Sequence, residues 1–578
     1  MRIVGGFAAP ETPSMNSSIP YARTAIALAT TLALGACGGD SSTTIDSAAT
    51  TAALQADVQN IVVIYAENRS FDNLFGNFPG ANGLGTVVDA NGTPTAAYVP
   101  QKDRDGTTVL ATLPQTWGGV TAAGIAPVVT QAQSAGLANK PFAVETAFQA
   151  SAGATLTTAT VTRDLYHRFF ENQMQINGGK NDMYAAWADA GGLTMGHFDY
   201  SGSAMYKLAQ QFVLADNFFE GAFGGSFLNH QYLVCACAPE YPNADTAAAK
   251  PTIAVVDKDA NGKYLARLTT AAASPASAMT GPPSYVLSGN ITPANYFGDN
   301  KFYAVNTMQP AYQPSGNAPV DLNGSDNLFA TTASATTLPP QTQTNIGDLL
   351  TAKGVTWKWY AGSWNAALTD GMQAAGVKRT VIYAGNANNV STTTNVDFQA
   401  HHHPFNYYAN FDPVTHAADR AAHLKDYTDL VADAAAGTLP SVAFYKPEGV
   451  YNQHEGYANL TDGDAKIADL VTKLQASPQW SKMVIVITYD EFGGVWDHVA
   501  PPKGDLLGPG TRIPAIIISP LAKKGTVDHT PYDTASVLRL ITRRFGLTTL
   551  PGLAARDAAL VTNGGQAMGD LTNALNLQ

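Results

Sequence analysis

Asn60–Tyr65 reads NIVVIY and Met483–Thr488 reads MVIVIT, and these two apolar runs decide the fold class. Both are almost continuously apolar instead of alternating, which is typical of strands buried on both faces of a parallel or mixed sheet. Four more runs of this kind are Phe212–Ala215, Val355–Tyr360, Val442–Tyr445 and Ala515–Ser519. Helical patterns lie between the runs, for example over Asp464–Gln475 and Thr534–Phe545. Strands that alternate with helices predict an α/β protein, a doubly wound α/β/α sandwich with a mostly parallel central sheet.

The chain is expected to form one such domain over residues 58–578. Its length of 578 residues allows up to roughly four domains, but one elaborated α/β domain is equally compatible with it. Thr86–Ala150 and Ala248–Pro340 are rich in Gly, Pro, Asn, Thr and Ala and lack strong periodicity. We predict that both are loop-rich insertions over the sheet.

The N-terminal residues have the pattern of an export signal over residues 1–36. Arg23 precedes an apolar core of about a dozen residues, too short for a transmembrane helix, and a small-residue cleavage site. Leu34–Cys37 (LGAC) also resembles a bacterial lipoprotein box, in which Cys37 would be lipidated. The alternative is a plain secretory signal with an incidental cysteine. Residues 37–57 are small and polar and predict a flexible tether.

Composition excludes two classes of protein. The net charge is −12, with no run of Lys or Arg, so general nucleic-acid binding is not expected. Three cysteines in 578 residues exclude a disulfide scaffold. Cys235 and Cys237 are separated by one residue, a poor spacing for an unstrained disulfide. Two small residues buried in a helix are the favoured interpretation, with a metal site as the alternative.

Acidic residues follow two of the predicted buried strands directly. Glu67 and Asn68 come after the first run, and Asp490 and Glu491 come after the run at Met483–Thr488. Ligands of open α/β sheets bind beyond the carboxyl ends of the strands. Oxygen ligands at that edge suit a divalent cation. Helix capping explains one acidic strand end, but two such ends favour a metal site.

Ser226 is a candidate nucleophile. Gly224-Gly225 leads from the run at Phe212–Ala215 to a predicted helix that begins at Ser226. The first turn of a helix offers free N–H groups and a positive dipole end, which attract phosphate-like anions. A serine there, next to a metal, can act as a nucleophile. The alternative is an ordinary capping serine.

Histidines supply the remaining chemistry. The run His401-His402-His403 is internal and is followed by Pro404, so we expect an ordered loop. Imidazolium can pair with phosphoryl oxygens or donate a proton near neutral pH. For any single histidine, a hydrogen-bonded structural role is the alternative.

Two long segments resemble a known family. Ile61–Gly76 (IVVIYAENRSFDNLFG) and Thr488–Pro502 (TYDEFGGVWDHVAPP) are similar to the two signature segments of the bacterial phosphoesterase family. That family contains phospholipases C and related acid phosphatases, and it belongs to the alkaline-phosphatase-like superfamily. Tyr166–Tyr184, Gly224–Leu233 and Phe398–Tyr408 look more like the acid phosphatase branch.

The resemblance implies roles for individual residues. A divalent metal, whose identity the sequence does not specify, would be held by Glu67, Asn68, Ser226, Asp490 and Glu491. Ser226 would also be the nucleophile. His167, His401, His402 and His454 would surround the phosphoryl group, with the first two of the three adjacent histidines aligned to the family. Supporting positions are Asp497, His498 and Lys180.

The main hypothesis is therefore an exported, metal-dependent phosphomonoesterase of acid phosphatase type that works through a phosphoserine. Protonated histidines would favour an acid optimum. The alternative is a phospholipase C that cleaves phospholipid phosphodiesters. A third hypothesis is a surface lipoprotein that binds metal or phosphate without turnover. The expected partner is a small phosphate ester or a phospholipid, with membrane contact through Cys37 and a periplasmic, cell-surface or secreted location.

Overall fold

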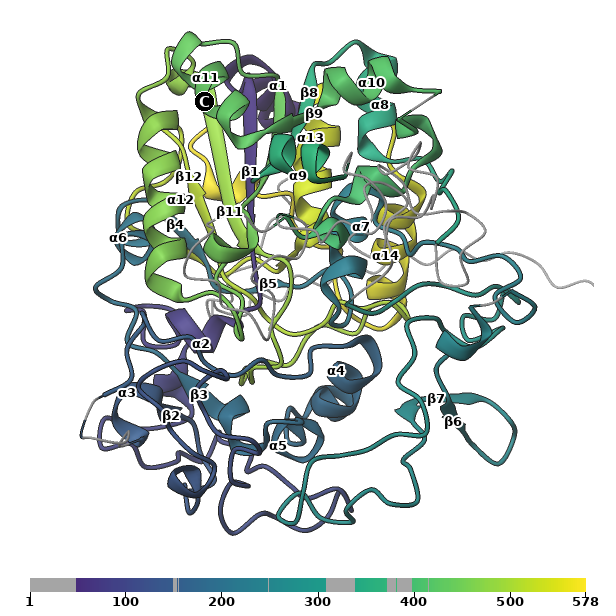
Figure 1. Cartoon of the computed structure of the whole chain (residues 1–578). Helices are drawn as coiled ribbons and strands as arrows, with labels where there is room; N and C mark the ends of the chain where they lie inside the picture. The colour runs from purple at the N-terminus through teal and green to yellow at the C-terminus, as the bar shows by residue number, and fades with distance from the viewer. Residues whose placement is uncertain are drawn as a thin grey trace, which may run out of the picture. The chain divides into compact units, whose positions relative to one another are not determined.

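An eight-stranded sheet forms the centre of the computed structural model (Figure 1). The structure describes residues 48–148, 153, 155–247, 249–307, 338–371, 381, 398–413 and 415–577. Ile45–Gln578 form one compact unit. The predicted export signal and Cys37 lie outside the described residues.

The sheet has the strand order β13-β4-β12-β11-β1-β10-β8-β9. All neighbouring strands pair in parallel except β12, which runs antiparallel to both β11 and β4. The strands are β1 (Asn60–Ala66), β4 (Val213–Ala215), β8 (Trp357–Ala361), β9 (Leu424–Asp426), β10 (Val442–Lys446), β11 (Met483–Tyr489), β12 (Ala515–Ile518) and β13 (Thr526–Asp528). Every residue of β1 and of β11 is buried. The six apolar runs thus form strands, and the predicted α/β fold with a mostly parallel sheet is confirmed.

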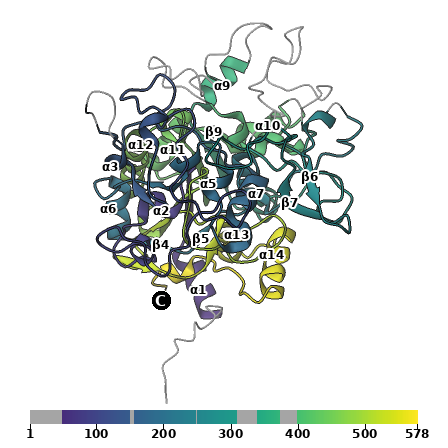
Figure 2. The same cartoon turned by 90° about the horizontal axis from the view of Figure 1, so that it is seen from below.

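Helices cover both faces of the sheet, as expected for a doubly wound fold (Figures 1 and 2). On one face lie α6 (Ala204–Gln211), α11 (Tyr427–Ala436) and α12 (Leu460–Gln475). On the other lie α1 (Ala48–Asp57), α7 (Ser226–Cys235), α8 (Ile346–Lys353) and α13 (Thr534–Phe545). Helices α12 and α13 match the two helical patterns of the sequence. None of the helices in the described ranges is long and apolar enough to cross a bilayer.

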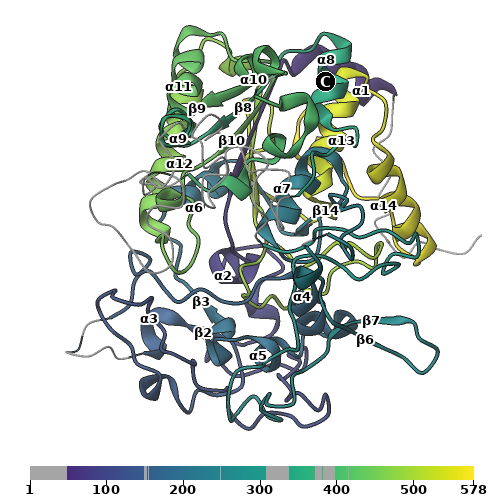
Figure 3. The same ribbon diagram turned by 45° about the vertical axis from the view of Figure 1, so that its right-hand side comes forward.

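A layer of short elements and long loops lies beyond the carboxyl ends of the parallel strands (Figure 3). Its helices are α2 (Phe71–Phe75), α3 (Val144–Ala147), α4 (Phe169–Ile176) and α5 (Tyr184–Trp187), and its strands are β2 (Phe142–Ala143), β3 (Gly196–His197), β6 (Val256–Lys258) and β7 (Tyr264–Leu268). The described parts of both predicted insertions lie in this irregular region. The other elements are β5 (Phe218–Phe219), β14 (Tyr532–Asp533), α9 (Trp364–Gly371), α10 (Ala417–His423) and α14 (Pro551–Thr562).

The predicted tether over residues 37–57 is wrong in its second half. Residues 48–57 form α1, in which Leu54 is fully buried. The Gln55 side chain donates to the Arg543 carbonyl, and Arg543 donates to Thr51 Oγ1 at 2.9 Å. A few apolar residues and side-chain bonds to α13 therefore anchor a segment whose small, polar composition indicates no fixed structure.

The interpretation of Cys235 and Cys237 as two unpaired helical residues is also wrong. Helix α7 ends at Cys235, and Ala236 takes a left-handed conformation with a φ of 51°. The chain turns there, so that the two cysteine Cα atoms lie 5.1 Å apart and the residues form a disulfide. A spacing of one residue argues against a disulfide within a helix. It does not do so here, because the backbone leaves the helix at Ala236.

Candidate active site

The carboxyl ends of β1 and β11 bring the predicted acidic residues together. The two strands pair in parallel with Ala66 opposite Tyr489, so the residues after each strand meet at one level. The Asn68 N–H donates to Asp490 Oδ1 at 3.0 Å, and the Arg69 N–H donates to the Glu491 carbonyl at 3.0 Å. The predicted metal ligands Glu67, Asn68, Asp490 and Glu491 are all fully buried.

Burying three neighbouring carboxylates away from water costs free energy unless a cation balances their charge. Burial, reinforced by the charge of Asp490, raises the pKa of Glu67 and that of Glu491 well above the usual range. Burial also raises the pKa of Asp490, against the opposing effect of Lys446. Asp490 Oδ2 and Glu491 Oε2 have no hydrogen-bond partner within the described part of the chain. This cluster fits a divalent cation in donor type and in charge.

The Asn68 amide lies between these carboxylates and a predicted histidine. One end of the amide is 3.2 Å from Asp490 Oδ1 and 3.3 Å from Glu67 Oε2, and the other is 2.9 Å from His454 Nε2. With its nitrogen toward the carboxylates, the amide donates to both and accepts from His454. With its oxygen toward them, three oxygens converge on one point, which is the arrangement a cation requires.

Ser226 lies at the first position of α7 with its side chain against the acidic cluster. Its Oγ donates to Glu491 Oε1 at 2.9 Å, and the residue is fully buried. The preceding Gly225 has a φ of 82°, and an added Cβ would lie 2.9 Å from the Val305 carbonyl oxygen. Glycine is required in this turn, which aims both the hydroxyl and the open end of the helix at the cluster.

His167 and His454 flank the cluster on one side. His167 Nε2 is 3.8 Å from Glu491 Oε1, and it has no hydrogen-bond partner in the described structure. The rings of His167 and His454 meet edge to face, with their centroids 5.2 Å apart. The His454 ring also stacks on Tyr457 at 4.5 Å, which fixes its orientation.

The three adjacent histidines point in different directions. His402 Nε2 is 3.1 Å from Glu67 Oε1, and the His401 ring lies 3.9 Å from that of His402. His403 instead packs against the Trp364 ring at 4.6 Å. The structure therefore brings His401 and His402 to the cluster, the same pair that the sequence alignment selects.

The expectation of protonated histidines near neutral pH is not met in the ligand-free protein. Burial lowers the pKa of His167 to about 4. Burial, with Lys446 and His167 adding to it, lowers the pKa of His401 to about 3. The pKa values of His402 and His454 are lowered well below the usual range, mainly by burial. Burial therefore favours the neutral form of all four rings and acts against the stated reason for an acid optimum.

Two further residues at the cluster are absent from the sequence predictions. Lys446, the last residue of β10, forms an ion pair with Glu67 Oε1. His230 lies one helical turn after Ser226, and its ring stacks on that of His402 with centroids 4.7 Å apart. The strand-end rule predicts the position of Lys446, which ends a buried strand. Helical periodicity predicts that of His230, which shares a helix face with Ser226.

Asp497 and His498 act at a distance from the cluster, in an ion network with Asp72 and Arg512. The buried Arg512 donates to Asp497 Oδ1 and to Asp72 Oδ1, each at 3.0 Å, and His498 Nδ1 is 2.7 Å from Asp72 Oδ2. Burial raises the pKa of Asp72, but His498 and Arg512 outweigh it and lower that pKa. Because the Arg512 guanidinium bonds to both Asp72 and Asp497, it links the segment after β1 to the segment after β11.

Lys180 is not brought to the cluster. It is exposed just beyond the short 3-10 turn Asn177–Gly179. The contacts recorded for the described residues do not join its side chain to the site. A supporting role for Lys180 therefore stays a prediction from the resemblance.

The geometry defines a class of site: a buried serine at a helix N-terminus, an acidic cluster suited to a cation, and a ring of histidines. Comparison with known proteins agrees with this class. The family model described as the Phosphoesterase family matches residues 58–548. The chain belongs to the Phosphoesterase family.

Several curated relatives are phospholipases C by name. Phospholipase C B of Mycobacterium tuberculosis is 30% identical over 174 residues, which are 26% of this chain and 32% of the relative. Non-hemolytic phospholipase C of Pseudomonas aeruginosa is 30% identical over 179 residues, 25% of each chain. Non-specific phospholipase C1 of Arabidopsis thaliana is 40% identical over 156 residues, 22% of this chain and 29% of the relative. The matched stretches span about a third of these relatives or less.

These names do not favour the acid phosphatase branch that the shorter motifs suggest. Among solved structures, the PsFucS1 sulfatase from Pseudoalteromonas sp. covers 65% of this chain and 72% of its own, at 12% identity and a TM-score of 0.24. That superposition is loose, so the fold assignment rests on the sheet itself.

Gly493 offers a test of how tightly the two strand ends are packed. Its φ is 65°, and an added Cβ would lie 2.2 Å from the Asn68 carbonyl oxygen. Gly493→Ala is therefore expected to lower the free energy of unfolding by about 2–3 kcal/mol. Urea unfolding measures this change. As a control, Gly85→Ala adds a methyl group in open space and is expected to change stability by about 0.5 kcal/mol or less. Equal effects of the two substitutions would show that the close approach carries no strain.

Proposed function

We propose that this protein is a phosphoric ester hydrolase in which Ser226 is the nucleophile and the Glu67–Asn68–Asp490–Glu491 cluster holds a divalent metal ion. One observation carries the proposal: Ser226 Oγ, at the open end of α7, donates to Glu491 Oε1 at 2.9 Å within the buried acidic cluster. A serine that only capped its helix would direct its hydroxyl at a backbone N–H of the first turn. Here the hydroxyl faces a carboxylate instead.

The reaction uses the hydroxyl–carboxylate pair directly. Ser226 Oγ forms a bond to phosphorus while the bond from phosphorus to the ester oxygen breaks. The serine proton passes to Glu491, which already accepts its hydrogen bond. The free N–H groups and the positive dipole end of α7 stabilise the anionic oxygens around phosphorus. Water then attacks the phosphoserine, and its oxygen bonds to phosphorus as the bond from phosphorus to Ser226 Oγ breaks. Ser226 Oγ recovers its proton from Glu491, and the proton that water releases to solvent balances the one that the leaving ester oxygen takes up.

The buried histidines complete the phosphoryl pocket. The unpartnered Nε2 of His167 and the neighbouring rings of His401, His402 and His454 can donate hydrogen bonds to phosphoryl oxygens. A bound divalent metal supplies charge that stabilises the transferred phosphoryl group and favours the deprotonated serine. Phosphoryl transfer depends mainly on such positioning and charge.

The substrate we propose is a phospholipid, cleaved at the phosphodiester as a phospholipase C cleaves it. The named relatives, all phospholipases C, support this choice. A small phosphate monoester is the second candidate, because the cavity beside the cluster is small, with a volume of about 10 Å³. The two candidates share one nucleophile and differ in the groups attached to phosphorus.

We also propose that the protein is exported and that Cys37 is lipidated. The signal-like sequence before Cys37 supports export. The disulfide between Cys235 and Cys237 agrees with it, because structural disulfides persist in oxidising compartments.

Ser226→Ala is expected to lower kcat by roughly 10³-fold or more, since the covalent step loses its nucleophile. The variant and the wild type are compared on the ester that the wild type cleaves best, and brief acid quenching tests for a phosphoserine in the wild type alone. Ser201→Ala, which removes an exposed hydroxyl bonded to Asp199, serves as the control. Full activity of Ser226→Ala would rule out the serine mechanism and leave water as the nucleophile.

Substrate choice separates the two candidates. The metal-loaded protein is assayed with phosphatidylcholine vesicles for release of phosphocholine and with p-nitrophenyl phosphate for release of inorganic phosphate. We expect phosphocholine release at the higher kcat/KM. Turnover of the monoester alone would make the protein a phosphomonoesterase. Inertness toward both esters would support the third hypothesis, a binding protein without turnover.

Metabolic labelling with palmitate tests the proposed anchor. We expect label on the full-length protein expressed in a bacterial host, and its loss in Cys37→Ser. Label that persists in Cys37→Ser, or an unlabelled wild type found in the medium, would leave a plain secretory signal.

A further inference from the structure

Lys446 is a buried cation at the edge of the candidate site. It ends β10, next to β1, and its side chain is only 3% exposed. Its Nζ pairs with Glu67 Oε1, and the structure records no second hydrogen bond from this ammonium within the described residues. An ammonium has three N–H donors, so donors remain for a ligand. Nothing in the proposed reaction so far uses this charge.

The same carboxylate belongs to a second group of metal-binding side chains. One ligand atom each of Glu67, His230 and His402 lies within 4.8 Å of the others. His230 Nε2 and His402 Nδ1 lack hydrogen-bond partners in the described structure, and His402 Nε2 faces Glu67 Oε1 at 3.1 Å. One carboxylate and two imidazoles could hold an ion such as zinc. The ammonium of Lys446 already lies on Oε1 of that carboxylate, the oxygen that His402 also faces, and two cations on one oxygen repel each other. The other oxygen, Oε2, faces Asn68 and stays available to the acidic cluster.

Lys446 and Ser226 bond to carboxylates that follow two different strands, Glu67 after β1 and Glu491 after β11. Lys446 itself ends β10, and in the sheet β10 and β11 lie on opposite sides of β1. In an in-line displacement, the attacking and leaving oxygens lie on opposite sides of phosphorus. If phosphorus lies over the end of β1, between the two, Lys446 stands on the side of the leaving oxygen.

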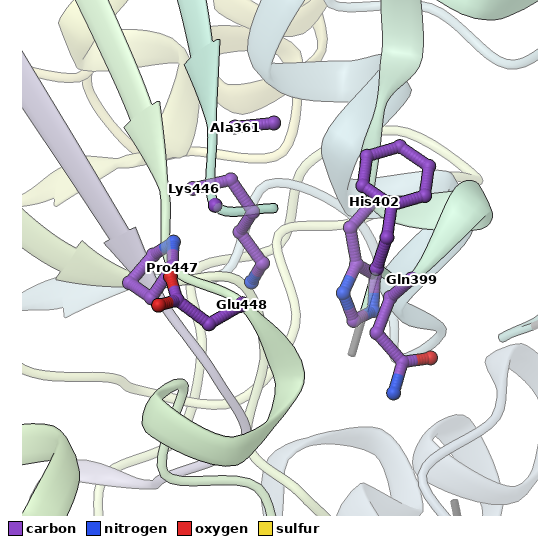
Figure 4. Close-up of a pocket in the computed structure, with 8 residues that line it drawn as sticks. Ala361, Gln399, His402, Lys446, Pro447 and Glu448 are labelled. Atoms are coloured by element: carbon purple, nitrogen blue, oxygen red, sulfur yellow. The ribbon is translucent and has the colours of Figure 1, made fainter. Parts of the chain in front are cut away.

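A cavity lies beside the Lys446 side chain. It is small, with a volume of about 10 Å³, and its lining includes Gln399, His402, Lys446 and Glu448. Figure 4 shows the Lys446 ammonium and the His402 ring facing each other across this space. Lys446 is thus common to the acidic cluster and to the cavity.

We propose that Lys446 is a catalytic residue that takes the place of a second metal ion at the leaving oxygen. The inference rests on the proposed phosphoester hydrolysis. When the bond from phosphorus to the ester oxygen breaks, its electron pair goes to that oxygen. An Nζ–H of Lys446 donates a hydrogen bond to that oxygen. The oxygen then takes its proton from solvent.

Variants at Lys446 separate charge from size. Lys446→Gln removes the charge and keeps a hydrogen-bond donor, and Lys446→Arg keeps the charge and the ion pair with Glu67. Lys358→Gln on the neighbouring strand β8 is the matched control, since it breaks an ion pair of 2.6 Å with Asp433 away from the cluster. Circular dichroism confirms that each variant is folded before assay. If Lys446→Gln does not fold, Lys446→Arg replaces it throughout.

The first measurement compares two leaving groups on the same phosphoryl centre. The p-nitrophenyl and the phenyl esters are used, as monoesters or as phosphocholine diesters according to which the wild type cleaves. Phenolate is a poorer leaving group than p-nitrophenolate, so its departure depends more on stabilisation of the negative charge on the leaving oxygen. Lys446→Gln is expected to lower kcat/KM by roughly 100-fold for the phenyl ester and by about 10-fold or less for the p-nitrophenyl ester. The same bias at a smaller size is expected for Lys446→Arg, and no change for Lys358→Gln. Equal losses on both esters would overturn the proposal.

The second measurement counts bound metal without using activity. The wild type is loaded with zinc or manganese and dialysed, and the metal is measured per chain by mass spectrometry. We expect one equivalent, because Lys446 excludes a second ion from Glu67, His230 and His402. A second equivalent that is lost in His230→Ala would overturn the proposal, because it would lie at Glu67, His230 and His402, and not at the groups Asp164–His167–His454 or Asp72–Asp497–His498. A wild type that cleaves no ester would refute the proposed hydrolysis, and the metal count would still test whether Lys446 replaces an ion.

Discussion

The parallel pairing of β1 with β11 is the constraint on which the candidate site depends. With Ala66 opposite Tyr489, the two strands deliver three carboxylates and one amide into the same dry space. A slip of one residue would turn every side chain of the shifted strand to the other face of the sheet and separate the cluster. Much of the surrounding structure balances the charge that this register concentrates: the Lys446 ammonium, the Ser226 hydroxyl and the network around Arg512 all bind to the segments that leave these strands.

Much of the fold could be predicted because its strands are buried on both faces. Six continuous apolar runs became six strands of the sheet, and the acidic residues directly after two of them lie together as the strand-end rule expects. His167, His401, His402 and His454 come from loops, so only the family resemblance could select them. The strand-end rule and the helix face of Ser226 place Lys446 and His230 at the site, but a lone lysine or histidine also fits a structural role, so neither stands out in the sequence.

The errors have local physical causes. Segment 48–57 is polar and small, yet one buried leucine and a few bonds to α13 are enough to fix it as a helix. The disulfide forms because Ala236 leaves the helical conformation, which no residue pattern indicates. In both cases a single backbone bend or contact outweighs the preference of the local sequence.

The position of β1 in the sheet also sets the order in which the protein can assemble. β1 is one of the first segments to be synthesised, but its two neighbours begin at Val442 and Met483. A nascent chain that ends before residue 440 already contains Ser226 and His401, yet the strand that carries Glu67 has no partner and its edges stay open. The sheet can close only when nearly the whole chain is available, so the unfinished protein must be protected from aggregation during synthesis. A chain that stops early would accordingly be inert, not partly active.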